Sequence, residues 1–199
     1  MSRISEQRRA DILSAALNEF MQRGLDGASM SEIAARAGIG KSTIYEYFPS
    51  KAVLFVAACK AEIRRVDQTI REIFSEDRPF SELLEAYLCL MLDLAQGVDY
   101  NEIMRMFSNA SVDELICAME EMSEDVADVT KKAIQRAQVR GELASDLDAT
   151  ITAVYLLGLP NPHTILRMRR LDRENPVKAI VDMALRGLKP GEGETKSKE

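Results

Sequence analysis

Apolar residues recur along this chain at intervals of three and four positions, which is the spacing of one face of an α-helix. The pattern predicts a first helix over residues 6–23, closed by Gly24, and a long helix over residues 51–74 with Ser50 as its N-cap. No stretch shows the sustained two-residue alternation that marks a half-buried β-strand. The sequence therefore predicts an all-α protein.

The second half of the chain continues the helical pattern. Segment 81–95 is apolar on nearly all sides and is expected at the centre of its domain. Ser111 and Glu114 have the spacing of a capping box, and Asn175 and Pro176 supply a cap and a first-turn proline. Residues 189–199 are expected to form a disordered tail. Helices are predicted at 81–95, 102–107, 111–141, 148–157 and 176–186.

Two short helical segments between residues 29 and 48 meet at Gly38. Ser29 and Glu32 stand three apart, as in a capping box, and open a segment whose apolar residues share one face. Those apolar residues are Met30, Ile33, Ala34 and Ala37. In the second segment Ile44 and Phe48 are expected to turn inward, which leaves donors of hydrogen bonds for the outer surface. The donors are Lys41, Ser42, Thr43, Tyr45 and Tyr47, and the pattern predicts a helix-turn-helix that reads DNA.

Glu46 lies among these donors and has two interpretations. Its carboxylate repels phosphate, so it either accepts a hydrogen bond from a cytosine amino group or stays solvated. The sequence leaves both open.

The charges are unevenly divided along the chain. The 199 residues carry a net charge of −6, which is unexpected for a protein that binds nucleic acid. Residues 1–65, however, hold ten Lys and Arg against seven Asp and Glu, and the remainder is acidic. We expect the acidic part to repel DNA, so that attraction is confined to the amino-terminal part.

Residues 1–50 resemble the DNA-binding domain of the tetracycline-repressor (TetR) family of bacterial regulators. In the rest of the chain the resemblance is limited to helical layout and the closing segment 185–190. Gly40 and Ser42 depart from the usual pattern, in which many members have serine and glycine at these places, and Gly40 makes the turn more flexible. The resemblance rests on Ile12, Ala15, Ala16, Phe20, Gly24, Ile33, Ala34, Ala37, Gly38, Lys41, Thr43, Tyr45, Phe48, Lys51 and Leu54.

The resemblance implies a DNA-binding domain at 1–50, a ligand-binding and dimerisation domain at 51–188, and the tail at 189–199. It implies a homodimer in which the last two helices of each subunit form a four-helix interface. Such a dimer would bind a palindromic operator in double-stranded DNA as a repressor, without a cofactor, and a small, largely apolar ligand would release it. An alternative is a ligand-independent DNA-binding adaptor that regulates a protein partner.

The resemblance also implies roles for individual residues. Ser29 becomes a contact to the DNA backbone, Lys51 a phosphate clamp, and the five donors above become contacts of the recognition helix. A ligand pocket is expected among the middle helices, where unbranched, polarisable methionines can adapt to apolar ligands or fill an ordinary core. Its candidate residues are Tyr87, Met91, Met104, Phe107, Met119, Met122 and Tyr155.

Enzymatic activity is not expected, because the single histidine, His163, has no clustered nucleophile and acid with which to form a catalytic site. Segment 35–42 fits a relaxed phosphate-loop pattern, but it follows a helical pattern where a phosphate loop follows a strand.

No metal site is predicted, and the cysteines are expected to be reduced core residues: Cys59, Cys89 and Cys117. Because no signal peptide or membrane-spanning run is evident, a cytoplasmic protein is expected.

Overall fold

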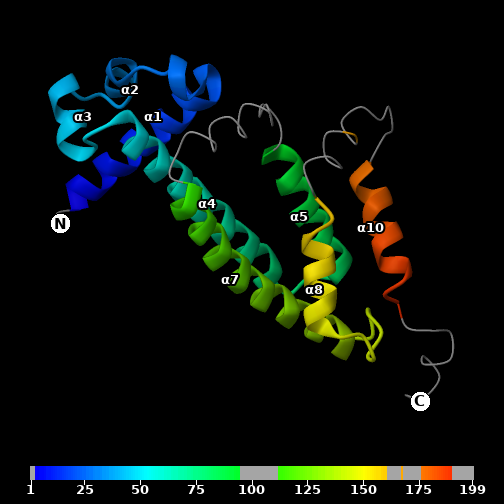
Figure 1. Ribbon diagram of the computed structural model, residues 1–199. Helices are drawn as coiled ribbons and strands as arrows, with labels where there is room; N and C mark the ends of the chain where they lie inside the picture. Colours follow the sequence, from blue (N-terminus) through cyan, green and yellow to red (C-terminus); the bar gives the residue numbers. More distant parts are fainter. Residues whose placement is uncertain (1–2, 95–111, 161–166, 168–175, 190–199) are drawn as a thin grey trace. The chain divides into compact units, whose positions relative to one another are not determined.

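The structure, a computed structural model, describes residues 3–94, 112–160, 167 and 176–189, with the side chains of all of these except 3–5 and 112–123. The described residues are helical and contain no β-strand, so the all-α prediction is confirmed (Figure 1). The helices are α1 (Arg3–Gly27), α2 (Met30–Arg36), α3 (Lys41–Tyr47), α4 (Lys51–Ser75), α5 (Phe80–Leu94), α7 (Val112–Val139), α8 (Ala149–Leu157) and α10 (Pro176–Arg186). No described helix combines the length and the apolar character that a membrane span requires.

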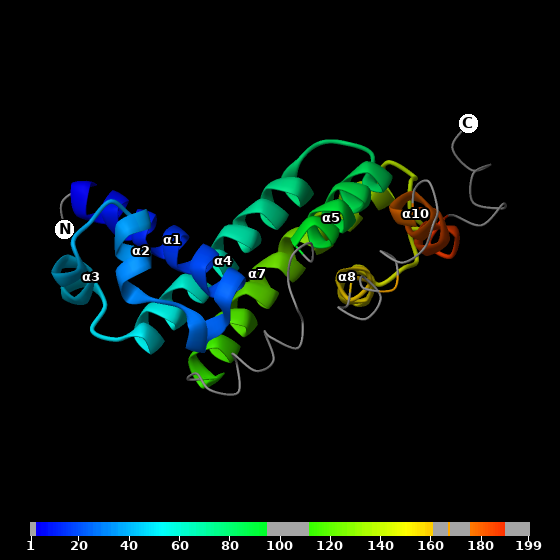
Figure 2. The ribbon, with the colours of Figure 1, turned by 90° about the horizontal axis from the view of Figure 1, so that it is seen from above.

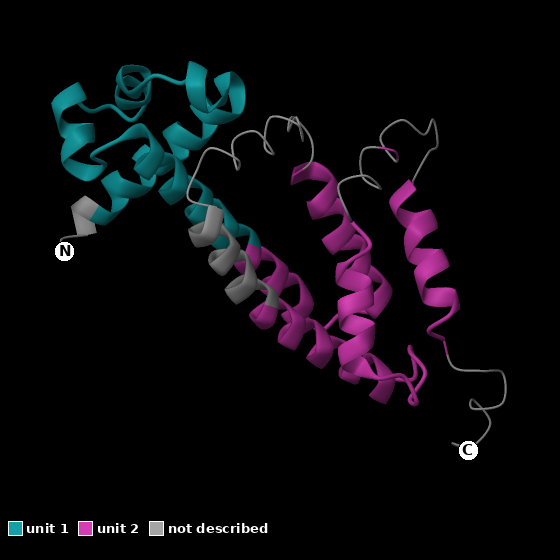
Figure 3. Cartoon of the chain, in the orientation of Figure 1, with its two compact units in different colours: residues 1–66, 97–121 teal, residues 67–96, 122–199 magenta. Residues whose placement is uncertain are grey.

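The chain divides into two compact units (Figure 3). Unit 1 comprises Met1–Val66 and Gly97–Glu121, and unit 2 comprises Asp67–Gln96 and Met122–Glu199. Helix α4 runs without a break from Lys51 to Ser75 and contributes residues to both units. The domain boundary expected after Ser50 stays a prediction.

Unit 1 is built around the apolar stripes that the sequence predicted. Phe20 of α1 is fully buried and meets Phe55 of α4 edge to face, with ring centroids 5.3 Å apart. An edge-to-face pair adds to the free energy of burial because the positive ring edge meets the negative ring face. Helices α1 to α4 thus share one core, whose fully or almost fully buried members include Ile12, Ala16, Phe20, Ile33, Ala34, Ile44, Phe48, Leu54 and Ala58.

The predicted end of the first helix at Gly24 is confirmed, because its φ of 69° and ψ of 174° are not helical and separate the first helix from a short helical segment that reaches Gly27. Another local prediction in unit 1 was wrong. The capping box is not formed: the Ser29 side chain makes no capping hydrogen bond, and Glu32 pairs with Arg23 at 3.0 Å. A nearby guanidinium attracts a carboxylate more strongly than a backbone N–H does. The predicted cap at Ser50 is confirmed, because its Oγ accepts a hydrogen bond from Val53 N at 3.2 Å.

Unit 2 has its own core, centred on α5 and α10, which pack against each other (Figure 2). The buried residues of α5 lie on one face, while its last turns are only half-buried. Tyr87 Oη donates a hydrogen bond to Leu157 O at 2.9 Å, which joins α5 to the end of α8, and burial raises the pKa of its phenol. The buried face consists of Phe80, Leu83, Leu84, Tyr87 and Leu88.

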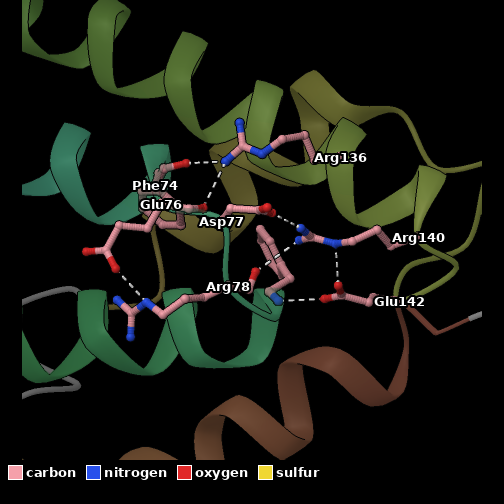
Figure 4. Close-up of polar contacts among 8 residues, drawn as sticks. Phe74, Glu76, Asp77, Arg78, Arg136, Arg140 and Glu142 are labelled. Carbon is pink, nitrogen blue, oxygen red and sulfur yellow. Dashed lines mark hydrogen bonds and ion pairs between the residues drawn. The ribbon is translucent and has the colours of Figure 1, made fainter.

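A polar cluster fixes the connection between α4 and α5 to the end of α7 (Figure 4). Arg140 pairs with Asp77 Oδ1 at 2.7 Å and donates to Arg78 O at 2.9 Å. Its Nε contacts Glu142 Oε1 at 2.6 Å, and Glu142 Oε2 accepts from Phe80 N at 2.5 Å, at the start of α5. All three nitrogens of this guanidinium therefore have partners within unit 2.

The later helix boundaries agree with the sequence where the structure describes them. Asp148 caps α8, because its Oδ1 accepts from Thr150 N at 2.8 Å and from Ile151 N at 2.9 Å, and α10 begins at Pro176. The predicted helix at 102–107 and the caps at Ser111 and Asn175 lie outside the described residues.

The cysteines do not share one environment. Cys59 is half-buried, and burial together with the charge of Glu62 raises its pKa to about 12. Cys89 is exposed, so its assignment to the core was wrong. It follows Leu88 on α5 and points away from the buried face, which periodicity could not reveal because α5 is apolar nearly all round. The Cys117 side chain lies outside the described residues.

Candidate nucleic-acid interface

The turn between α2 and α3 depends on Gly38. Its φ of 67° lies in the left-handed region, which glycine adopts without the penalty of a Cβ. Two hydrogen bonds close the turn, from Gly38 N to Ala35 O at 3.1 Å and from Ile39 N to Ala34 O at 3.0 Å. The chain then enters α3 through Gly40, whose φ of −71° and ψ of 154° are open to any residue.

Helix α3 has one buried face and one exposed face. Ile44 is fully buried and Phe48, directly after the helix, is 1% exposed. Of the predicted recognition residues, Lys41, Ser42 and Tyr45 are exposed. Thr43 and Tyr47 are half-buried, and Tyr47 packs against the core of unit 1.

Four predicted contact residues line one concavity of about 470 Å³ on unit 1. Ser29 comes from the start of α2, Lys41 and Tyr45 from α3, and Lys51 from the start of α4. These side chains present hydroxyl and ammonium groups, which donate hydrogen bonds to phosphate oxygens. The complete lining is Ala28, Ser29, Met30, Ser31, Lys41, Tyr45, Pro49, Ser50 and Lys51.

Lys51 also has a structural role that sequence reasoning missed. Its Nζ donates to Asp26 O at 3.0 Å, in the last turn of α1, and to Ala28 O at 3.2 Å, in the connection between α1 and α2. An ammonium group has three donors, so one N–H is left for another acceptor. The same side chain can therefore hold this connection and contact a phosphate.

A second missed feature is the buried carboxylate of Glu19. It is fully buried in α1 and forms ion pairs with Arg23 at 3.3 Å and with Arg36 of α2 at 3.2 Å. A buried charge needs such partners because desolvation is unfavourable. The signal available in the sequence was Glu19 beside Phe20, within the apolar stripe of α1 and four residues before Arg23.

Arg9 was also missed as a contributor to this unit. Its guanidinium lies over the Phe48 ring, 4.9 Å from the centroid, which is the geometry of a cation–π contact. The contact joins the first turns of α1 to the end of the recognition helix. No sequence spacing predicts it, because the two residues are distant along the chain.

The predicted pocket residues do not share one environment. Tyr87 is buried with its hydroxyl bonded to Leu157 O, and Met91 is half-buried. Tyr155 is 53% exposed and lies on the outer side of α8, which favours a contact surface over an enclosed pocket for this residue. The remaining candidates lie outside the described side chains: Met104, Phe107, Met119 and Met122.

Exposed apolar side chains gather on α8 and occur again on α10. Ile151, Val154 and Tyr155 are 70%, 63% and 53% exposed, and their spacing places them on one face of α8. Met183 of α10 is 69% exposed. Contiguous apolar side chains on a surface mark sites of contact with another molecule.

The phosphate-loop alternative fails on local structure. Segment 35–42 begins in helix α2 and ends in helix α3, so a helix leads into it where a phosphate loop needs a strand. A phosphate loop needs a preceding strand to hold its backbone open around a phosphate. The geometry instead defines a class of protein, a DNA-binding protein of the helix-turn-helix type.

Comparison with known proteins agrees with this class. Residues 12–58 match the family described as bacterial regulatory proteins, tetR family. RutR of Escherichia coli O157:H7, an HTH-type transcriptional regulator, is 28% identical over 156 residues, which cover 78% of this chain and 71% of RutR. RutR of strain K12 is 30% identical over 125 residues, and the chain spans only 58% of that relative.

Solved structures share the fold over most of the chain. A TetR-family transcriptional regulator from Mesorhizobium loti superposes with a TM-score of 0.67 at 24% identity, covering 94% of this chain and 96% of that one. FadR of Bacillus subtilis, in complex with stearoyl-CoA, gives a TM-score of 0.60 at 21% identity, covering 89% and 95%. The resemblance to TetR-family transcriptional regulators that the sequence predicted is therefore confirmed.

Proposed function

We propose that this protein is a homodimeric repressor that binds a palindromic operator and leaves it when a small, largely apolar ligand binds. Regulators of this family are typically repressors with ligand-binding domains. A dimer on an operator represses by occupying DNA that the transcription machinery needs.

The observation that carries the DNA-binding proposal is the concavity that joins Ser29, Lys41, Tyr45 and Lys51 beside the exposed face of α3. Its donors can hold phosphates while α3 presents Ser42 and its neighbours to base edges. The backbone contacts would set the register of the helix, and the base contacts would supply sequence preference. Thr43 and Tyr47 are proposed as secondary contacts, since each is half-buried.

The dimer is supported by the apolar face of α8 and by Met183 of α10. A symmetric dimer buries the same face of both subunits, so each exposed side chain would gain a partner from the other copy. Two recognition helices related by this symmetry can enter successive major grooves when the half-sites lie about 34–36 Å apart. This requirement explains why the operator should be palindromic.

The ligand proposal rests on the apolar character of α5 and on the half-buried Met91 near its end. In B. subtilis FadR a similar fold holds stearoyl-CoA. A ligand that binds better to a conformation with poor DNA affinity lowers operator occupancy without competing for the DNA surface.

The deciding experiment combines operator selection with measurement of mass in solution. The protein is incubated with fragments of its source genome, the bound fragments are sequenced, and the oligomeric state is measured by sedimentation equilibrium. We expect one enriched palindrome and a dimer. A monomer without preference for any double-stranded sequence at moderate ionic strength would contradict the proposal.

A further inference from the structure

Glu46 lies on the outermost face of the recognition helix. Ile44, the fully buried residue of α3, fixes which way the helix faces. In an α-helix the residues two positions before and after a given residue lie roughly opposite it, about 160° around the axis. Ser42 and Glu46 are these two residues, and both are exposed. Tyr45 lies to one side of this direction and is partly covered, at 43% exposure.

The Glu46 carboxylate has no partner within the part of the chain that the structure describes. It forms neither a hydrogen bond nor an ion pair there. Three other carboxylates of unit 1 are neutralised by arginines: Glu19 and Glu32 pair with Arg23, and Glu62 pairs with Arg65. Glu46 therefore presents a free negative charge on a surface whose other polar groups suit an anion.

This carboxylate loses part of its hydration once α3 lies in a major groove. The residues opposite Ile44 then face the groove floor, where base edges replace some of the surrounding water. A desolvated carboxylate without a donor strongly disfavours binding. Most groups on the floor are acceptors or methyl groups: O6 and N7 of guanine, N7 of adenine, and O4 and the methyl of thymine. The donors are the amino groups of cytosine and adenine.

Between these two donors, cytosine suits a carboxylate better. The adenine amino group lies beside N7, an acceptor on the same base that repels the second carboxylate oxygen, whereas the cytosine amino group has no acceptor beside it on its own base. Resting on the function proposed above, we propose that Glu46 is a specificity-determining residue that accepts a hydrogen bond from a cytosine amino group in each operator half-site. Repulsion of the acceptor-bearing edges of the other bases adds to the selection for cytosine.

The test uses selection from a random duplex library with the full-length protein and two variants, Glu46→Gln and Glu46→Ala. We expect the wild type to require cytosine at one position of each half-site. The glutamine amide, which pairs with both N7 and the amino group of adenine, should change that preference toward adenine. The alanine variant should lose the preference. The ratio of its affinity for sites with cytosine to its affinity for sites with another base at that position should fall by about tenfold.

A matched control distinguishes base recognition by Glu46 from a general effect of removing one negative charge from unit 1. Glu6→Gln removes one exposed carboxylate from α1 of the same unit and should leave every position of the selected sequence unchanged. Salt titrations on random duplex should show tighter binding for both Glu46 variants, because a repulsion from phosphate has been removed.

The outcomes distinguish this inference from the function on which it rests. A wild-type palindrome that both Glu46 variants select unchanged would overturn the role of Glu46 and leave the regulator proposal intact. A selected half-site in which no position requires cytosine would also overturn the role of Glu46 and leave the regulator proposal intact. A wild-type protein that selects no sequence would overturn the regulator proposal itself.

Discussion

The DNA-binding helices of unit 1 and the outer helices of unit 2 place their apolar residues in opposite ways. Around the helix-turn-helix, the large apolar side chains of α1 to α3 close over a shared core, and α3 exposes polar groups and one tyrosine. On α8, by contrast, Ile151, Val154 and Tyr155 face outward. The core of the first region is closed by residues of unit 1 itself, whereas the residues that the structure describes leave the apolar face of α8 uncovered.

The difference indicates the chemistry of each partner. A polar, donor-rich surface loses little by remaining in water and gains charge-assisted hydrogen bonds from phosphates. An apolar surface gains by leaving water, at roughly 25 cal/mol per Å² buried, and a second copy of the same face supplies a cover. The predictions below test whether the two regions meet these two kinds of partner.

The largest effect is expected from Ile151→Glu, which places a charge on the apolar face of α8. In a symmetric dimer two carboxylates would be buried without partners. The free energy of dimerisation should then become less favourable by about 3 kcal/mol or more. We expect sedimentation equilibrium to show a monomer and operator affinity to fall by about a hundredfold or more. Val139→Glu is the control, since Val139 is 80% exposed but belongs to α7. If both variants stay dimeric, the α8 face is not the interface.

A pair of tyrosines compares the two regions directly. Tyr45 and Tyr155 are similarly exposed, at 43% and 53%. Tyr45→Ala should weaken operator binding by about 1–3 kcal/mol with the dimer unchanged, because it removes a contact between the recognition helix and the DNA. Tyr155→Ala should instead weaken dimerisation. Fluorescence anisotropy and sedimentation measured on both variants would contradict the assignment if the two effects were exchanged or identical.

Lys51→Ala should lower affinity for specific and random DNA almost equally. The salt dependence of binding should become shallower by about one unit of slope, since one phosphate contact is lost. The free energy of unfolding should fall by about 1 kcal/mol, because Asp26 O and Ala28 O lose their common donor. Lys132→Ala removes an exposed lysine of unit 2 as the control. An unchanged slope for Lys51→Ala would exclude it as a phosphate contact.

The smallest effect is expected from Gly40→Ser at the start of α3. A Cβ at this position meets Thr43 Oγ1 at 3.8 Å and Ser42 Oγ at 3.9 Å, which are ordinary contacts. Loss of chain entropy in the unfolded state and a new N-cap hydroxyl should stabilise the protein by about 0.5–1 kcal/mol. Gly38→Ser should destabilise it, since its φ is 67°. Chemical denaturation of both variants tests the pair, and stabilisation by both would refute this account of the turn.

The helices themselves could be predicted because their signals are local. The period of apolar residues, the left-handed glycine at position 38 and Pro176 at the start of α10 each act within a few residues, so the bounds of most described helices followed from the sequence. The resemblance at residues 1–50 added the expected contacts. The resemblance could not predict which of these contact residues are exposed and which are half-buried, because their exposure depends on how Ile44 packs into the core.

The sequence by itself determined that the chain is helical, that a glycine turn joins two short helices near residue 38, and that polar side chains follow the turn. Only the tertiary structure decided that Lys51 is bound to two carbonyls, that Glu19 is a buried partner of Arg36, and that Tyr155 faces outward. The physical reason is the distance along the chain over which the deciding interactions act. Helix formation depends on neighbours three or four residues away, whereas burial and ion pairing depend on which distant helices the core brings together.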